Sequence, residues 1–235
     1  MKIWGMRLIA LVTGLCILLA LAFTAIELVA FDKDRYVKAY AEGGTADYIG
    51  ISEEDLMTVT DRLLDYLALK EDSLDMQMVI RGELQTVFEE RESLHMVDVR
   101  NIFAAGFALR RWTVILAVAG VITLLAVQKK QTFRLLAQGY LWAMALFAAF
   151  AIVLGIAMAV DFNRAFILFH HLLFTNDLWL LNPLTDVLIQ MFPEVFFSDM
   201  ATAILVWACI AVAAPAVISA VYLICQRRRE RSHEL

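Results

Sequence analysis

RLIALVTGLCILLALAFTAIELVAF, residues 7–31, contains Glu27 as its one charged residue after Arg7. A helix of roughly 20 apolar residues is long enough to cross a bilayer. Lys2 and Arg7 precede the apolar residues, as basic residues do in a signal peptide. The apolar part is too long for a signal sequence, however, and no clear A-x-A cleavage site precedes Asp32. We therefore interpret this stretch as an uncleaved first membrane span.

Three further apolar blocks follow along the chain. The second, Trp112–Val127, is short for a span, and we extend it backward through Phe103–Leu109. Pro215 should kink the last block, which is tolerated where neighbouring helices satisfy the freed backbone groups. The predicted spans are residues 7–31, 103–128, 135–160 and 200–225. They are joined by residues 32–102, 129–134 and 161–199, with ends at 1–6 and 226–235.

Charge and cysteine content define the class and orientation of the protein. Of its residues, 61% are hydrophobic and 19% charged, and the net charge of −5 gives no basic character that would attract nucleic acid. Nine basic residues flank one side of the spans, which the positive-inside rule makes cytoplasmic, together with both termini. Residues 32–111 and 161–199 have net charges of −7 and −4 and are predicted to lie outside. Cys16, Cys209 and Cys225 all lie within or at the edge of apolar blocks, so the outer segments hold no disulfide.

The first outer segment is long enough to fold. Ser52 and Asp55 form a start typical of a capping box, and apolar residues follow at helical spacing, so we predict a helix over Glu53–Lys70. Apolar and polar residues then alternate over Leu74–Arg81, which predicts a strand. Gly82 is expected to turn it toward a second strand near Leu84–Phe88. The predicted fold class is a mainly α membrane protein of four transmembrane helices, with a small extracytoplasmic α/β lid between spans 1 and 2.

The second outer segment is unusually apolar for a loop. Residues 165–174 read AFILFHHLLF, which is too short to cross a bilayer and is predicted to lie at the membrane interface. Asn176-Asp177 and Asn182-Pro183 mark turns, and Thr185–Met191 is a short helical piece that ends before Pro193.

No serine-esterase, zincin, nucleotide-binding or thiol-redox motif is present, which leaves histidine as the candidate for chemistry. His233 lies in the predicted cytoplasmic tail, whereas His95, His170 and His171 lie outside, near the membrane interface. On a helix, Asp98 would share a face with His95 and could fix its tautomer. A surface ion pair is the commoner explanation of such spacing. His170 and His171 lie among hydrophobes, where ionisable groups are usually functional, with snorkelling toward headgroups as the alternative.

Other candidate residues have simpler explanations. Arg110 and Arg111 beside Trp112 are typical interface anchors that contact lipid phosphates. Trp179 belongs to an aromatic-rich stretch that is typical of packing and of an interface belt. No metal-ligand spacing joins the histidines, so no metal site is predicted.

Two stretches resemble a known family. LHMVDVRNIF at residues 94–103 and FHHLLFTNDLWLLNPLTDVLIQMFPEVFF at residues 169–197 resemble the bacterial lipoprotein intramolecular transacylases, and the layout of four spans matches. In that family one histidine precedes the Asn-Asp pair by six residues, which implies His170, six before Asn176. The resemblance implies that His95 and His170 are catalytic and leaves His171 at a variable position. We expect Asp98, His171, Asn176 and Asp177 to be supporting residues.

The resemblance implies a reaction in the bacterial cell membrane. The family moves the sn-2 acyl chain of a diacylglyceryl-cysteine lipoprotein to the α-amine of that cysteine, giving a lyso-form lipoprotein. Membrane lipids and diacylated lipoproteins are therefore the expected partners, with no cofactor. A neutral imidazole suits such proton transfer, so we expect His95 and His170 to approach each other, with His170 as base and His95 as donor. A non-enzymatic scaffold or lipoprotein-binding module is the alternative. A solute transporter fits less well, since the spans hold few polar or helix-breaking residues.

Overall fold

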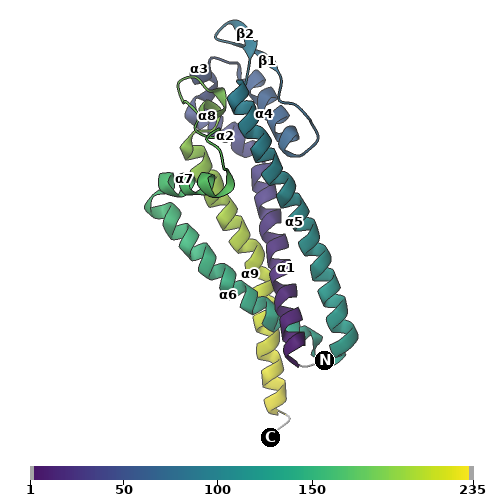
Figure 1. The fold of residues 1–235 in the computed structure, drawn as a ribbon. Coiled ribbons are helices and arrows are strands. Elements are labelled where there is room, and N and C mark those ends of the chain that lie inside the picture. Colours follow the sequence, from purple (N-terminus) through teal and green to yellow (C-terminus); the bar gives the residue numbers. More distant parts are fainter. Residues whose placement is uncertain (1–2, 233–235) are drawn as a thin grey trace. The chain divides into compact units, whose positions relative to one another are not determined.

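The computed structural model describes residues 3–232, and helices dominate it (Figure 1). Four helices are long and apolar enough to cross a membrane, which confirms the four predicted spans: α1 (Ile3–Ala30), α5 (Glu90–Gln128), α6 (Thr132–Val160) and α9 (Glu194–Ser232). The remaining elements are α2 (Lys33–Gly43), α3 (Thr45–Ile49), α4 (Glu53–Leu67), β1 (Gln77–Ile80), β2 (Glu83–Thr86), η1 (Lys129–Gln131), α7 (Phe162–Leu173) and α8 (Val187–Met191). His233 lies outside the described residues.

Two of the four long helices extend well beyond their apolar parts. α5 and α9 have 39 residues each, which at 1.5 Å per residue is about 58 Å, compared with roughly 30 Å for the hydrocarbon core. The first 13 residues of α5 contain six charged or titratable side chains: Glu90, Arg91, Glu92, His95, Asp98 and Arg100. This N-terminal part of α5 is therefore too polar to belong to the membrane-spanning part.

The described chain divides into two compact units. Residues 3–29, 107–156 and 203–232 form what we call the span unit, because it holds most of the apolar length of the four long helices. Residues 30–106 and 157–202 form the connecting unit, which contains the segments between spans 1 and 2 and between spans 3 and 4. The connecting unit contains both candidate catalytic histidines.

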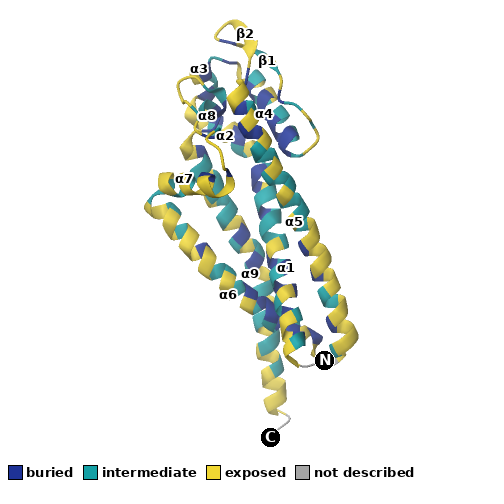
Figure 2. Cartoon of the chain, viewed as in Figure 1, coloured by how far each residue is buried: buried dark blue, intermediate teal, exposed yellow. Residues whose placement is uncertain are grey.

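Small residues and single hydrogen bonds hold the span unit together. A Cβ atom on Gly14 of α1 would lie 2.8 Å from the backbone of Gly139 on α6, so these helices approach each other closely. Such contacts between small residues are typical of helices that pack in lipid. The Tyr140 hydroxyl of α6 donates to the Val212 carbonyl of α9 at 2.8 Å, in the turn before Pro215. Figure 2 shows exposed residues along much of α6, and large apolar side chains are among them.

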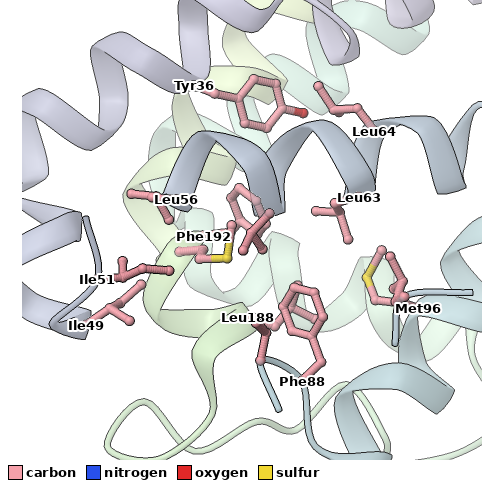
Figure 3. Close-up of a cluster of buried hydrophobic side chains, with 14 of the residues drawn as sticks. Tyr36, Ile49, Ile51, Leu56, Leu63, Leu64, Phe88, Met96, Leu188 and Phe192 are labelled. Carbon is pink, nitrogen blue, oxygen red and sulfur yellow. The ribbon is translucent and has the colours of Figure 1, made fainter. Parts of the chain in front are cut away.

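A conventional apolar core holds the connecting unit together. It joins α2, α3, α4, the N-terminal part of α5, α8 and the start of α9. Figure 3 shows side chains of α4 facing Leu188 and Phe192, which lie about 130 residues further along the chain. All four apolar positions that predicted α4 are buried: Leu56, Val59, Leu63 and Leu67. The Ser52 hydroxyl accepts from the Asp55 N–H at 3.0 Å, which confirms the predicted cap.

The predicted hairpin is present with a two-residue turn. β1 and β2 pair antiparallel, with Ile80 opposite Glu83, so Arg81 and Gly82 form the turn between them. Both residues have positive φ, as a type I′ turn requires. The strands are shorter than predicted, because each has one neighbour and only four residue pairs form. The Arg81 N–H donates to the Gly50 carbonyl at 2.7 Å, which ties the hairpin to the end of α3.

Other boundaries differ from the prediction by a few residues. α4 ends at Leu67 rather than Lys70, because Leu69 adopts a positive φ that a helix cannot continue. α8 begins at Val187 rather than Thr185, since the Asp186 carboxylate accepts from the Asn182 N–H and the Thr185 hydroxyl. α2 and α3 were not predicted. Their sequence is short and mixed in polarity, and they are held by tertiary contacts of Tyr36, Tyr40 and Ile49.

Candidate active site

His170 lies in the last turn of α7. The helix begins where the Asp161 carboxylate accepts from the Arg164 N–H at 3.0 Å, and it ends where the Phe174 N–H donates to the His170 carbonyl at 2.8 Å. His170 Nδ1 lies 2.7 Å from the Phe166 carbonyl oxygen. Because a carbonyl can only accept, Nδ1 carries the proton in this hydrogen bond. In the neutral ring the lone pair is therefore on Nε2.

Aromatic rings surround His170. Its ring centroid lies 4.2 Å from that of Phe166, 4.7 Å from that of Trp179 and 5.5 Å from that of Phe174. The side chain is 7% exposed, so these rings exclude most water from it. Burial lowers the pKa of His170, the hydrogen bond to Phe166 opposes that shift, and His171 adds to it. His170 is consequently neutral at pH 7.

His95 lies opposite His170, on the polar N-terminal part of α5. The two ring centroids are 6.2 Å apart and the rings are tilted by 33°, which confirms that the two segments bring the histidines together. His95 is also 7% exposed and contacts the edge of Phe174. Burial, with a smaller contribution from His170, lowers the pKa of His95 to about 4, although Asp98 favours its charged form. Its buried Nδ1 has no hydrogen-bond partner among the described residues.

The predicted supporting residues connect the two segments. The Asn176 side-chain amide donates to the Asp98 carboxylate at 2.9 Å. Asp98 thus affects His95 through its charge, and its hydrogen bond goes to Asn176. Asn176 also accepts from the Leu178 N–H at 3.1 Å, which forms the predicted turn. The Asp177 backbone carbonyl accepts from the Arg91 guanidinium.

Two contributors to this geometry, Arg91 and Glu92, were not predicted. Glu92 is fully buried, and its carboxylate accepts backbone N–H groups of Glu89 and Leu188 at 2.7 and 2.6 Å. Both residues lie in the run EERE, which is typical of a solvated helix start. The only available signal was that Glu92 is three residues before His95 and thus on the same helical face.

The remaining predicted residues lie in different surroundings. His171 is exposed, and its ring meets that of Trp179 edge-on at 5.2 Å. Trp179 is buried, with its ring against that of His170, and its Nε1 has no hydrogen-bond partner among residues 3–232. In the span unit, Arg110 forms an ion pair with Glu27 at 2.7 Å. Arg111 is exposed and has no ion pair within the described part of the chain.

A metal centre has no basis in the described residues. No group of three or more His, Cys, Asp or Glu side chains among residues 3–232 is arranged to hold an ion. What the arrangement offers is two neutral imidazoles enclosed by aromatic rings, suited to moving protons near neutral pH.

Comparison with known proteins places the chain in a family. The family model "Lipoprotein intramolecular transacylase Lit" matches residues 11–197. The in meso structure of Lit from Bacillus cereus is 26% identical, has a TM-score of 0.77, and the match covers 97% of this chain and 100% of that one. Two structures of the same protein, with one histidine replaced by arginine or by alanine, are each 27% identical with TM-scores of 0.72. Each of these two matches covers 96% of this chain, and they cover 95% and 96% of the other.

No curated protein sequence matches the chain. The family model nevertheless covers well over half of its length, and a structure of that family matches over nearly all of both chains. The protein is therefore a multi-pass integral membrane enzyme that belongs to the lipoprotein intramolecular transacylase family.

Proposed function

We propose that this protein moves the sn-2 acyl chain of a diacylglyceryl-modified lipoprotein onto the α-amine of the same cysteine, with His95 and His170 as the catalytic pair. The observation that carries the proposal is the close approach of these two buried imidazoles, from segments 75 residues apart in the sequence. Family membership supports intramolecular acyl transfer on a lipoprotein.

His170 is the proposed base. Its Nδ1 proton is engaged by the Phe166 carbonyl, so Nε2 has a free lone pair. The substrate amine, with a pKa of about 8, attacks the ester in its neutral form and gives up a further proton as its bond to the carbonyl carbon forms. A neutral imidazole beside it typically accelerates such a step by roughly 10²–10⁴-fold.

His95 is the proposed hydrogen-bond donor. A buried N–H without a partner is costlier than a buried lone pair, so the favoured tautomer of His95 leaves the unpartnered Nδ1 as the lone pair. The proton is then on Nε2. Because its pKa is about 4, His95 stays neutral at pH 7 and donates that N–H to the oxygen that becomes negative. The charge of Asp98 stabilises any positive charge that develops on the ring.

The reaction balances without a cofactor. The amine nitrogen attacks the ester carbonyl while His170 Nε2 takes its proton, and His95 Nε2–H stabilises the oxyanion. Collapse breaks the bond from the carbonyl carbon to the glyceryl oxygen, and the proton on His170 passes to that oxygen. Amine and ester belong to one molecule, so orientation contributes up to roughly 7–11 kcal/mol and no covalent acyl-enzyme is required.

Contacts with lipid are proposed for the exposed apolar face of α7 and for Arg111. Leu168, Phe169 and Leu172 are exposed on α7, while His170 points into the unit, so this helix can lie along a membrane interface. Arg110 is already paired with Glu27, which leaves Arg111 to contact a lipid phosphate. A cavity of about 350 Å³ in the span unit is bordered by Thr24, Phe107, Arg110 and Arg111.

Trp179 was proposed from the sequence as an interface residue. Its proposed role is to hold the His170 ring in place, because the two rings pack together.

The proposed location is the bacterial cell membrane, with both termini cytoplasmic. Nine basic residues on one side of the spans support this orientation. Reporter fusions after Lys130 and Arg231 should indicate the cytoplasm, and fusions near Gly44 and Asn182 the outside. An outside signal at Lys130 would reverse the orientation and move the histidines to the cytoplasmic face.

The catalytic pair is tested by His95→Asn and His170→Asn. Asn is not a base, so His170→Asn should abolish lyso-form production at normal membrane abundance. The amide nitrogen of Asn occupies the place of Nδ1 and does not reach that of Nε2, so His95→Asn loses the proposed donor and should abolish production as well. His171→Asn is the matched control, since His171 is exposed, and its effect should be mild. Mass spectrometry of lipoprotein N-terminal peptides measures the product. Near-normal production by either of the first two variants would exclude the two-histidine mechanism.

The pH dependence of activity gives a second measurement. Protonation of the substrate amine, whose pKa is about 8, lowers activity below that pH whatever the histidines do. Since burial lowers the pKa of both histidines, a further decline due to the imidazoles should begin only below pH 6.5. A second decline that begins well above pH 6.5, after the titration of the amine is accounted for, would argue against these neutral imidazoles.

A further inference from the structure

Glu92 has a buried carboxyl group without a partner cation. Its side chain is 0% exposed, and none of the ion pairs among the described residues includes it. Burial raises the pKa of Glu92, and its two backbone N–H donors oppose that shift. Burying a carboxylate costs several kcal/mol unless hydrogen bonds compensate for the lost water. A helix can be capped without burying a carboxylate, as the exposed Ser52 hydroxyl does at the start of α4.

The two hydrogen bonds of Glu92 join distant segments. Oε2 accepts from the N–H of Glu89, the residue before α5, at 2.7 Å, as the third helical residue does in a capping box. Oε1 accepts from the N–H of Leu188 in α8 at 2.6 Å, across 96 residues of sequence. One carboxylate therefore fixes the start of α5 to the segment that follows His170.

The position of Glu92 relative to His95 gives this contact its significance. Glu92, His95 and Asp98 are spaced by three residues and share one face of α5. Glu92 binds Leu188 on one side of His95, and Asp98 binds Asn176 on the other. His170 belongs to the segment that carries both partners, so the distance between the imidazoles depends on these contacts.

We propose that Glu92 is a positioning residue, which holds α5 and the 174–188 segment in the register that keeps His95 and His170 within reach of one substrate. This inference rests on the proposed function of the histidine pair. Glu92 itself does not contact the histidine rings through any hydrogen bond, so it acts through geometry. A displacement of about 1 Å at a catalytic pair typically costs up to roughly 10²-fold in rate.

Glu92→Gln tests the proposal. The amide keeps the shape, but its NH₂ group faces a backbone N–H, so one of the two hydrogen bonds is lost. We expect kcat to fall by roughly 10–100-fold while KM changes little, because the histidines are misplaced rather than the substrate contacts. If this variant does not accumulate, Glu92→Asp keeps the charge but is one methylene shorter, and it should also lower kcat.

Thr60→Val is the matched control for general destabilisation. Thr60 is 0% exposed in the same unit, and its hydroxyl bonds to the Tyr40 hydroxyl at 2.8 Å and to the Leu56 carbonyl. It connects α2 with α4 and contacts neither histidine segment through these bonds. Thr60→Val should lower the stability of the unit with kcat unchanged. An equal loss of kcat in both variants would show that stability alone governs activity and would overturn the proposal.

Comparing Glu92→Gln and Glu92→Asp with His170→Asn separates this proposal from the proposed function. Normal kcat in both Glu92→Gln and Glu92→Asp, with His170→Asn inactive, would exclude positioning while leaving the histidine mechanism intact. An active His170→Asn variant would instead refute the catalytic pair, whatever Glu92→Gln does.

Discussion

The span unit and the connecting unit are both rich in apolar residues, yet they are stabilised in different ways. In the connecting unit large apolar side chains are buried together, with aromatic contacts such as Tyr36–Phe192 and Tyr36–Phe196. In the span unit many large side chains are exposed, and the close contacts involve glycine and alanine. The hydrophobic effect in water favours burial of apolar side chains in the connecting unit. Lipid is as apolar as leucine, so it provides no such driving force for packing in the span unit.

This difference explains where the chemistry lies. Two imidazoles and a carboxylate are buried in the connecting unit, where backbone N–H and C=O groups at helix ends and turns supply hydrogen bonds. The helices of the span unit use their backbone groups internally, so they have few to offer a polar site. Four predictions test the contrast between the two units.

The largest effect is expected from Phe192→Ala. Phe192 is 5% exposed and its ring packs against Tyr40 and Phe196, so truncation should cost about 3–5 kcal/mol. Phe150→Ala on α6, where the side chain is 63% exposed, is the matched control and should have little effect in a bilayer. Hydrogen exchange of each unit measures both. Similar losses of stability in the two variants would mean that the span unit, like the connecting unit, is stabilised by burying large apolar side chains.

Acid should weaken the connecting unit through His95. Its pKa is about 4 when folded and 6.5 when unfolded, so the unfolded chain binds a proton first as the pH falls. Between pH 6.5 and about 4 this should remove up to roughly 3 kcal/mol of stability, which is fully present above pH 6.5. His95→Asn should abolish this part of the pH dependence. An identical pH profile in wild type and His95→Asn would contradict the lowered pKa.

Gly139→Ala should disrupt the span unit. A Cβ atom there would overlap the Ala10 carbonyl and lie 2.8 Å from the Leu11 nitrogen, and backbone does not yield easily. We expect a cost of about 1–3 kcal/mol. Gly155→Ala is the control, since its Cβ would make an ordinary 3.6 Å contact with Leu205. Thermal unfolding in detergent compares them, and equal melting temperatures would show that close approach at Gly139 is unimportant.

The smallest effect is expected from Tyr140→Phe. It removes the hydroxyl that donates to Val212 before Pro215, at a cost of about 1 kcal/mol. Tyr222→Phe removes a hydroxyl with no hydrogen bond among the described residues and should be neutral. A Tyr140→Phe variant as stable as wild type would mean that the turn before Pro215 needs no external donor.

Periodicity and local chemistry determined much of this protein. The four spans, α4 with its Ser52 cap, the Arg81-Gly82 turn and the turns at Asn176 and Asn182 all depend on nearby residues. Such features are set by apolar length, spacing and turn chemistry, which a single sequence displays. The histidines could also be selected from the sequence alone, because ionisable residues are rare among apolar ones.

Only the tertiary structure decided how the site is assembled. The sequence offered His95 as a partner for Asp98, but the Asp98 carboxylate accepts from Asn176, 78 residues away, because the fold brings that amide within reach. Glu92 looks like a solvated charge in the sequence and is completely buried in the structure. The tautomer of His170 depends on a local carbonyl, but its aromatic enclosure depends on Trp179. Contacts between residues far apart in the chain leave no periodic pattern, so the burial and the hydrogen-bond partners of the site residues could not be predicted from the sequence.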